Sequence, residues 1–243
     1  MENKNILITG GSSGVGCLLV KELSKNNNVI TLARRIDKLN QLFGDNPNVK
    51  TFKADLADLT DLNNVLHEID KEVNGFDCIV NCAGVMTSGS IDNLTISDYT
   101  RSLNVNAISP LIIVKHYLHY MKNNNFGRII NFTSGAPLNC FANYSAYSAS
   151  KAFLNSWTVT LGRELKDYNI KINIMSPGPV KTEMAPNATL PAEICLPTFF
   201  YLLDTVETSS SFYWLGYKVP LSPDLEGVDW LHGIGNEKLT KIL

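Results

Sequence analysis

The chain lacks the features that mark several classes of protein. Among its 243 residues, no apolar run approaches the length of a membrane-spanning helix, and the start, MENKNIL, has neither the basic nor the apolar region of a signal peptide. The formal net charge of -2 at pH 7 leaves no basic excess for binding nucleic acid. We therefore expect a cytoplasmic protein with no membrane and no nucleic-acid partner.

Metal-ligand patterns are also scarce. The five cysteines are scattered with no CxxC pair, which is typical of reduced thiols packed mostly in the interior. His116 and His119 are close enough on a predicted helix to share a ligand, but no carboxylate or cysteine cluster accompanies them. His67 and His232 are isolated in the sequence. The sequence predicts no metal site.

The chain does contain a regular alternation of apolar runs and amphipathic stretches. The runs NVITLA, NVKTFKA, FDCIVNCAG, GRIINFTS and IKINIMSP are nearly continuous and rich in β-branched residues. Helical patterns separate them around Leu39, from Leu62 to Val73, from Tyr99 to Met121 and from Tyr147 to Leu165. This predicts a doubly wound (Rossmann) α/β fold in one domain, residues 1–243, with helices on both faces of a parallel sheet. A ligand should lie at the carboxyl ends of the strands.

The first apolar run, Ile6 to Ile8, leads into a glycine-rich turn and then into a helical pattern. Glycines in such a turn let the backbone approach a pyrophosphate, whose charge is stabilised by amide groups at the start of the following helix. The spacing here is Gly-x-x-x-Gly-x-Gly, which differs from the common Gly-x-Gly-x-x-Gly fingerprint. We expect a dinucleotide to bind at Gly10, Ser12, Ser13, Gly14, Val15 and Gly16.

The end of the second apolar run indicates which dinucleotide is preferred. An acidic residue there would accept hydrogen bonds from a ribose 2'-hydroxyl, but the chain has Ala33, followed by Arg34 and Arg35. Two guanidinium groups favour NADP, because each can make charge-assisted hydrogen bonds to a 2'-phosphate. The alternative is that both are solvated charges opening a helix, and NAD remains possible.

Two further strand ends carry candidate cofactor contacts. Asp55 and Leu56 are expected to flank the adenine, although Asp55 could equally cap the next helix. In NCAG, Asn81, Ala83 and Gly84 permit close approach to a cofactor ribose, although a simple tight turn would use the same residues.

Tyr147 and Lys151 lie one helical turn apart in SAYSASKAF, so that the phenol and the ammonium can point into one pocket. A nearby lysine stabilises phenolate and lowers the tyrosine pKa, which makes Tyr147 a candidate general acid. The pair alone could arise by chance. Tyr144 has no lysine four residues later and is not a candidate.

Together, TGGSSGVG, NCAG and SAYSASKAF resemble the motifs of the short-chain dehydrogenase/reductase family, in the same order and over residues 3 to about 185. Only Ser13, where a basic residue is often seen, departs from the NADP pattern. The resemblance implies hydride transfer between NADPH and a carbonyl or alcohol substrate. It implies that Tyr147 is the general acid, that Ser134 binds the substrate oxygen, and that Lys151 lowers the tyrosine pKa and binds the nicotinamide ribose.

The same resemblance extends to three further features. The register against the family's VN motif selects Asn106 over Asn104 as the asparagine that interrupts a helix and completes a proton path. In SPGPVKTEM, the family segment that touches the nicotinamide corresponds to Pro177, Gly178, Val180 and Thr182. The family's usual homodimer or homotetramer would be built from the helical stretches that end at Met121 and Leu165.

Beyond Met184 the sequence departs from the family pattern. We expect a substrate lid over residues 185–215 and a last short strand at Tyr217 to Val219. The apolar stretch Leu196 to Leu203 could line a substrate pocket, cover the core or meet another subunit. Two alternatives to an NADP-dependent reductase remain: an NAD-dependent alcohol dehydrogenase, and a dinucleotide-binding sensor without turnover.

Overall fold

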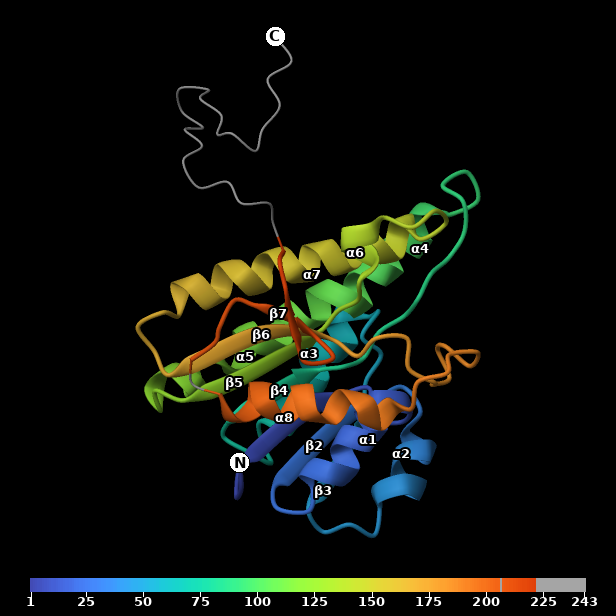
Figure 1. Cartoon of the computed structure of the whole chain (residues 1–243). Coiled ribbons are helices and arrows are strands. Elements are labelled where there is room, and N and C mark those ends of the chain that lie inside the picture. Colours follow the sequence, from blue (N-terminus) through green and yellow to red (C-terminus); the bar gives the residue numbers. More distant parts are fainter. Residues whose placement is uncertain (206, 222–243) are drawn as a thin grey trace.

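A computed structural model of the chain describes residues 1–205 and 207–221. At its centre, the described residues form one sheet with the strand order β3-β2-β1-β4-β5-β6-β7-β8 (Figure 1). Neighbouring strands are parallel from β3 to β7, and β8 runs antiparallel to β7. The strands are β1 (Asn5–Thr9), β2 (Asn28–Ala33), β3 (Val49–Lys53), β4 (Cys78–Asn81), β5 (Gly127–Phe132), β6 (Ile170–Ser176), β7 (Phe212–Trp214) and β8 (Tyr217–Val219). The strand order reverses direction at β1, so the predicted doubly wound sheet is confirmed.

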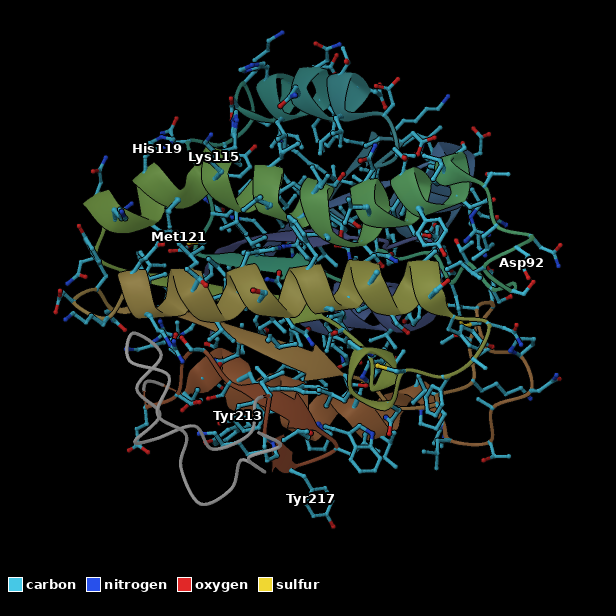
Figure 2. All side chains as sticks on the ribbon, turned by 90° about the horizontal axis from the view of Figure 1, so that it is seen from above. Asp92, Lys115, His119, Met121, Tyr213 and Tyr217 are labelled. Atoms are coloured by element: carbon cyan, nitrogen blue, oxygen red, sulfur yellow. The ribbon has the colours of Figure 1, made fainter. Side chains whose placement is uncertain are left out.

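Helices cover both faces of this sheet. They are α1 (Gly14–Leu23), α2 (Ile36–Phe43), α3 (Leu59–Ile69), α4 (Ile96–Leu103), α5 (Ser109–Asn123), α6 (Ala136–Asn139), α7 (Ser145–Glu164) and α8 (Leu196–Asp204). Side chains alternate along each strand, so Ile6 and Ile8 pack with α1, α2 and α8, while Leu7 packs with α3 and α5 on the other face. Figure 2 shows α5 and α7 lying side by side. Among the described residues, no helix has both the length and the apolar character needed to cross a membrane.

The segment after β6 contributes to the core. Phe199, Leu202 and Leu203 of α8 are buried, and the Phe199 ring stacks on Phe132 of β5 with 6.4 Å between centroids. The apolar stretch that begins at Leu196 therefore covers the sheet. The predicted last strand at Tyr217 to Val219 is present as β8, and residues 222–243 of the predicted domain lie outside the described residues.

The predicted helix from Tyr99 to Met121 is interrupted. Its two parts, α4 and α5, are joined by a π-helical turn, Asn104–Ile108, that carries Asn106. A π turn inserts one extra residue into a helix and is common at functional sites. Here the extra residue lets the Asn106 side chain turn inward towards the exit of β4.

Candidate active site

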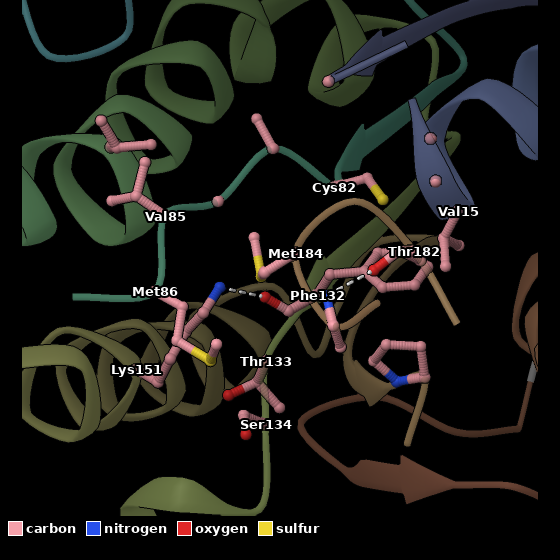
Figure 3. Close-up of a pocket in the computed structure, with 18 of the residues that line it drawn as sticks. Val15, Cys82, Val85, Met86, Phe132, Thr133, Ser134, Lys151, Thr182 and Met184 are labelled. Atoms are coloured by element: carbon pink, nitrogen blue, oxygen red, sulfur yellow. Dashed lines mark hydrogen bonds between the residues drawn. The ribbon is translucent and has the colours of Figure 1, made fainter. Parts of the chain in front are cut away.

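A cavity of about 1100 Å³ lies at the carboxyl ends of the strands. It brings together residues from the glycine-rich turn, the ends of β2 to β6 and helix α7, and Figure 3 shows part of its lining. The sequence-predicted residues that line it are Gly10, Ser12, Ser13, Gly14, Val15, Gly16, Arg34, Arg35, Asp55, Leu56, Ala83, Gly84, Ser134, Tyr147, Lys151, Pro177, Gly178, Val180 and Thr182. Two predicted residues, Asn81 and Asn106, lie outside the lining.

The glycine-rich turn lies directly against the exit of β4. Gly10 has a φ of +82°, and a Cβ there would come within 2.8 Å of the Cα of Ala83. The Thr9 hydroxyl accepts hydrogen bonds from the backbone N–H groups of Cys82 and Ala83, both at 3.1 Å. Only glycine tolerates this close approach and this backbone conformation without strain.

The start of α1 fits a bound phosphate group. Ser13 is the N-cap, but its side chain does not cap the helix, and the first turn carries no acidic residue. The first N–H groups of α1 therefore keep their capacity to bind an anion. On the far side of the cavity, the buried Thr133 hydroxyl has no hydrogen-bond partner among the described residues. Both observations fit an elongated polar ligand such as a dinucleotide.

The two arginines after β2 differ in their contacts. Arg35 donates to the hydroxyls of Ser13 (2.9 Å) and Ser12 (3.2 Å), and its other terminal nitrogen pairs with Glu183 at 2.8 Å. Arg34 is exposed, lines the cavity and has no ion-pair partner within residues 1–205 and 207–221. Arg34 is therefore the cation available to a ligand at this strand end.

The residues after β3 show which aspartate caps helix α3. The Asp58 carboxylate caps α3 by accepting from the N–H groups of Thr60 and Asp61 at 2.9 and 3.1 Å. Asp55 instead accepts from the N–H of Ala57 at 3.0 Å and lines the cavity. The interpretation of Asp55 as the helix cap is therefore wrong.

Asn81 lies inside the protein and not at the edge of the sheet. Its Nδ2 donates to Oδ1 of Asn131 at 2.8 Å, and Asn131 donates in turn to Thr158 of α7 at 2.8 Å. These bonds connect β4, β5 and α7. The NCAG motif gave no sign of this, because a motif does not show which face of the sheet a strand residue occupies.

Asn106 links the exit of β4 to α7. Its Oδ1 accepts from the N–H of Val85 at 2.8 Å, and its Nδ2 donates to the carbonyl of Val85 at 2.9 Å and to the Ser150 hydroxyl at 2.9 Å. Ser150 donates to the backbone carbonyl of Tyr147 at 2.7 Å. The asparagine is fully buried, so these bonds position both sides of the cavity.

Three side chains converge at the deep end of the cavity. Ser134 follows β5, and its hydroxyl lies beside the phenol of Tyr147 on α7. Burial raises the pKa of Tyr147, and the neighbouring Ser134 hydroxyl lowers it in part. Lys151, one turn further along α7, is 4% exposed and donates to the Phe132 carbonyl at 2.7 Å (Figure 3).

The lysine does not act on the tyrosine in the way that the sequence indicates. Burial lowers the pKa of Lys151 from 10.5 to about 8, and its Nζ lies 6.0 Å from the centre of the Tyr147 ring. The net shift of the Tyr147 pKa is upward in this arrangement, because loss of water outweighs the opposing effect of the Ser134 hydroxyl. The expectation that Lys151 lowers this pKa is therefore not met here.

Sequence reasoning missed several residues of the cavity. Glu183 lines it from the loop after β6. Five large apolar side chains also line it, although each is at least 42% exposed: Met86, Leu138, Phe141, Met184 and Trp214. Thr133 could have been found, because it precedes Ser134 at a strand end. The apolar residues come from four separate segments, including α6 and β7, and no spacing in the sequence connects them.

One polar cluster lies outside the cavity. His116 lies 2.9 Å from Asp70, which is also 3.5 Å from His67, so His67 is not isolated in space. One nitrogen or oxygen atom from each of these side chains lies within 4.8 Å of the others, where the end of α3 meets the middle of α5. A hydrogen bond joins His116 to the Asp70 carboxylate, and His67 contacts the same carboxylate, so these pairs account for the cluster.

The fold and the cavity define a doubly wound α/β protein of the dinucleotide-binding type. The short chain dehydrogenase family matches residues 4–192, and the chain belongs to this family. It is 30% identical over 183 residues to a 3-ketodihydrosphingosine reductase of Bos taurus, covering 71% of this chain and 55% of that protein. It is 29% identical over 189 residues to a 2,3-dihydro-2,3-dihydroxybenzoate dehydrogenase of Bacillus subtilis (strain 168), covering 76% of this chain and 72% of that protein.

Solved structures share the fold. One described as a 4-hydroxyisoleucine dehydrogenase complexed with NADH matches with a TM-score of 0.82 at 24% identity, covering 88% of this chain and 97% of that chain. The named relatives are reductases and dehydrogenases, which agrees with the expectation of an NAD(P)-dependent oxidoreductase. The matched region spans little more than half of the bovine reductase.

Proposed function

We propose that the protein is an NADP-dependent oxidoreductase that transfers a hydride between NADPH and a carbonyl or alcohol substrate. The observation that carries this proposal is the convergence of Ser134, Tyr147 and Lys151 in the same cavity as the glycine-rich turn. A protein that only binds a dinucleotide needs the turn but not the three proton-handling groups. When bound, the cofactor would supply the hydride.

The side chains of this chain would handle the proton and position the substrate oxygen. The Tyr147 phenol would donate its proton to the oxygen of a carbonyl substrate, and the Ser134 hydroxyl would donate a hydrogen bond to the same oxygen. Lys151, whose pKa is about 8, would exchange protons readily near neutral pH. The carbonyl of Phe132 holds the lysine Nζ in the cavity.

The preference for NADP rests on the end of β2. Ala33 offers no carboxylate to a ribose 2'-hydroxyl, and Arg34 faces the cavity with its charge available. At this position a 2'-phosphate would gain a charge-assisted hydrogen bond. The alternative is an NAD-dependent alcohol dehydrogenase, and the structural neighbour described above was complexed with NADH.

The substrate is proposed to be a bulky apolar carbonyl compound. The mouth of the cavity presents exposed apolar side chains from the loops after β4 and β5, such as Met86 and Phe141, and others from the C-terminal part of the chain. Burying such surface against an apolar substrate is favourable, at roughly 25 cal/mol per Å². Within the expected lid, residues 185–215, the lining residues are Ala185, Phe212 and Trp214, while α8 belongs to the core.

The proposal includes a homodimer or homotetramer in the cytoplasm. A shallow hollow of about 340 Å³ lies between α5 and α7 and is lined mainly by apolar side chains, including Phe153, which is 42% exposed. A second copy of the same two helices could fill it. All five cysteines are free thiols, which fits a reducing compartment.

The test is NADPH consumption by the purified protein across aldehydes, ketones, quinones, keto-sugars and acyl thioesters of increasing apolar size, with Tyr147→Phe alongside. Turnover that the variant loses, without losing NADPH affinity, would support the proposal. A fully active Tyr147→Phe would contradict the mechanism. Tight NADPH binding with no turnover on any compound would favour a dinucleotide-binding sensor.

A further inference from the structure

Glu183 forms ion pairs across the cavity. It lies on the loop after β6, and its carboxylate oxygens contact Arg35 at 2.8 Å and Lys38 at 2.5 Å. Arg35 directly precedes α2 and Lys38 lies in its first turn, so the two cations share one face of the helix start. Hydrogen bonds from Lys38 and then Arg35 lower the pKa of Glu183, which is therefore ionised at neutral pH.

The position of Glu183 is set by its backbone as well as by these pairs. Thr182 and Ala185 exchange backbone hydrogen bonds at 3.2 and 3.4 Å, so Glu183 lies within a closed turn. Thr182 packs against the glycine-rich turn, since a Cβ added to Gly14 would come within 3.1 Å of its methyl group. We therefore expect the turn to keep its place when the carboxylate alone is removed.

The carboxylate occupies Arg35, a cation of the cavity lining that a nucleotide phosphate could also use, and Lys38 one helical turn away. Arg35 joins Glu183 to the serine hydroxyls of the glycine-rich turn, and both Arg35 and Glu183 line the cavity beside Arg34. A 2'-phosphate near Arg34 and Arg35 would lie close to this negative charge. Either the phosphate meets like-charge repulsion, or Glu183 must give up its two cations first.

We propose that Glu183 is a specificity residue that competes with the ribose 2'-phosphate for Arg35 and Lys38 and so limits the preference for NADP over NAD. The inference rests on the proposed function in one respect, which is that the adenosine ribose binds at the end of β2. NAD has no 2'-phosphate, so its binding carries no such penalty. The chain thus combines an arginine that favours NADP with a carboxylate whose negative charge reduces the difference in affinity between NADP and NAD.

The test uses Glu183→Gln, which keeps the length of the side chain and its capacity to accept hydrogen bonds. Calorimetric titration with NADPH and NADH gives both dissociation constants directly, without any substrate. We expect the variant to bind NADPH about three- to tenfold more tightly at low ionic strength, because exposed charge interactions of this size are typical and are screened by salt. NADH affinity should change less than twofold.

The matched control is Glu72→Gln. Glu72 pairs with Lys50 on the surface and does not line the cavity, so this variant has the same change in net charge and also loses a lysine pair. The control should leave the ratio of the two affinities unchanged. An unchanged or smaller NADPH preference in Glu183→Gln would overturn the inference while leaving the proposed function in place. Wild-type protein that bound neither cofactor would overturn both.

Discussion

The Nζ of Lys151 donates a hydrogen bond to the carbonyl oxygen of Phe132, 2.7 Å away, at the deep end of the cavity. The lysine is 4% exposed, and burial lowers its pKa from 10.5 to about 8. The folded protein therefore holds this proton less tightly than the unfolded chain does. The buried charge therefore lowers the free energy of unfolding by its full amount below about pH 8. This destabilisation disappears as the pH rises past 10.5.

Lys151→Met should stabilise the fold at neutral pH. The variant keeps an unbranched side chain and removes the buried charge, so we expect its free energy of unfolding at pH 7 to rise by up to about 3 kcal/mol. The difference in free energy of unfolding between the variant and the wild type should decrease between pH 8 and 9.5. Urea unfolding of both proteins across this pH range measures that difference. A variant of equal or lower stability at pH 7 would show that the bond to Phe132 outweighs the cost of burial.

Arg34→Ala should weaken NADPH binding much more than NADH binding. Arg34 lines the cavity and keeps its charge available, so we expect a loss of about tenfold or more for NADPH, the size of one charge-assisted hydrogen bond. NADH affinity should stay within about twofold, because it lacks the phosphate. Fluorescence titration with each reduced cofactor measures both constants.

The control for Arg34→Ala is Arg163→Ala, which removes one positive charge at the end of α7, outside the cavity lining. It should affect neither cofactor. Equal weakening of NADPH and NADH by Arg34→Ala would remove the assignment of NADP.

Asn106→Ala should destabilise the fold more than Asn104→Ala. Asn106 pairs with both backbone groups of Val85 and with Ser150, so its loss leaves buried polar groups unpaired, at a cost of about 2 to 5 kcal/mol. Asn104 makes one bond, to the carbonyl of Ala57 at 3.0 Å, in a partly buried position. Chemical denaturation of the two variants compares them directly. Equal losses would show that the π turn does not depend on the inward asparagine.

The sequence predicts the parts of this protein that depend on local pattern. The alternation of apolar runs gives the sheet and its helices, and the motif spacings place Gly10, Ser134 and Tyr147 at one edge of it. Each of these is fixed by residues close together in the chain, or by the rule that parallel strands end at one edge. The resemblance to a known family then supplies the order of the motifs.

The sequence does not predict contacts that depend on distant segments. Glu183 meets Arg35 only because the loop after β6 folds across the cavity, and Asn81 meets Asn131 because two strands that are distant in sequence are neighbours in the sheet. The bond from Lys151 to Phe132 depends on depth of burial, which spacing along a helix does not give. Such pairings require the tertiary structure.

The outer face of α7 should form a subunit interface. Phe153 is 42% exposed and, with Leu111, Trp157 and Leu161, lines the hollow between α5 and α7. We expect light scattering to give two or four times the chain mass of 26.9 kDa for the wild type. Phe153→Glu should shift the protein towards monomer, because a charge in an apolar interface loses its hydration without gaining a partner.

The control for Phe153→Glu is Tyr201→Glu. Tyr201 is 52% exposed on α8, which covers the opposite face of the sheet, so the change in charge and in exposed aromatic surface is matched. This variant should keep the wild-type mass. Circular dichroism would establish that both variants fold, since α7 also carries Tyr147 and Lys151. A monomeric wild type would show that the protein has no subunit interface. A Phe153→Glu variant that keeps the oligomeric mass of the wild type would show that the interface lies elsewhere, because a buried charge at Phe153 would disrupt an interface formed there.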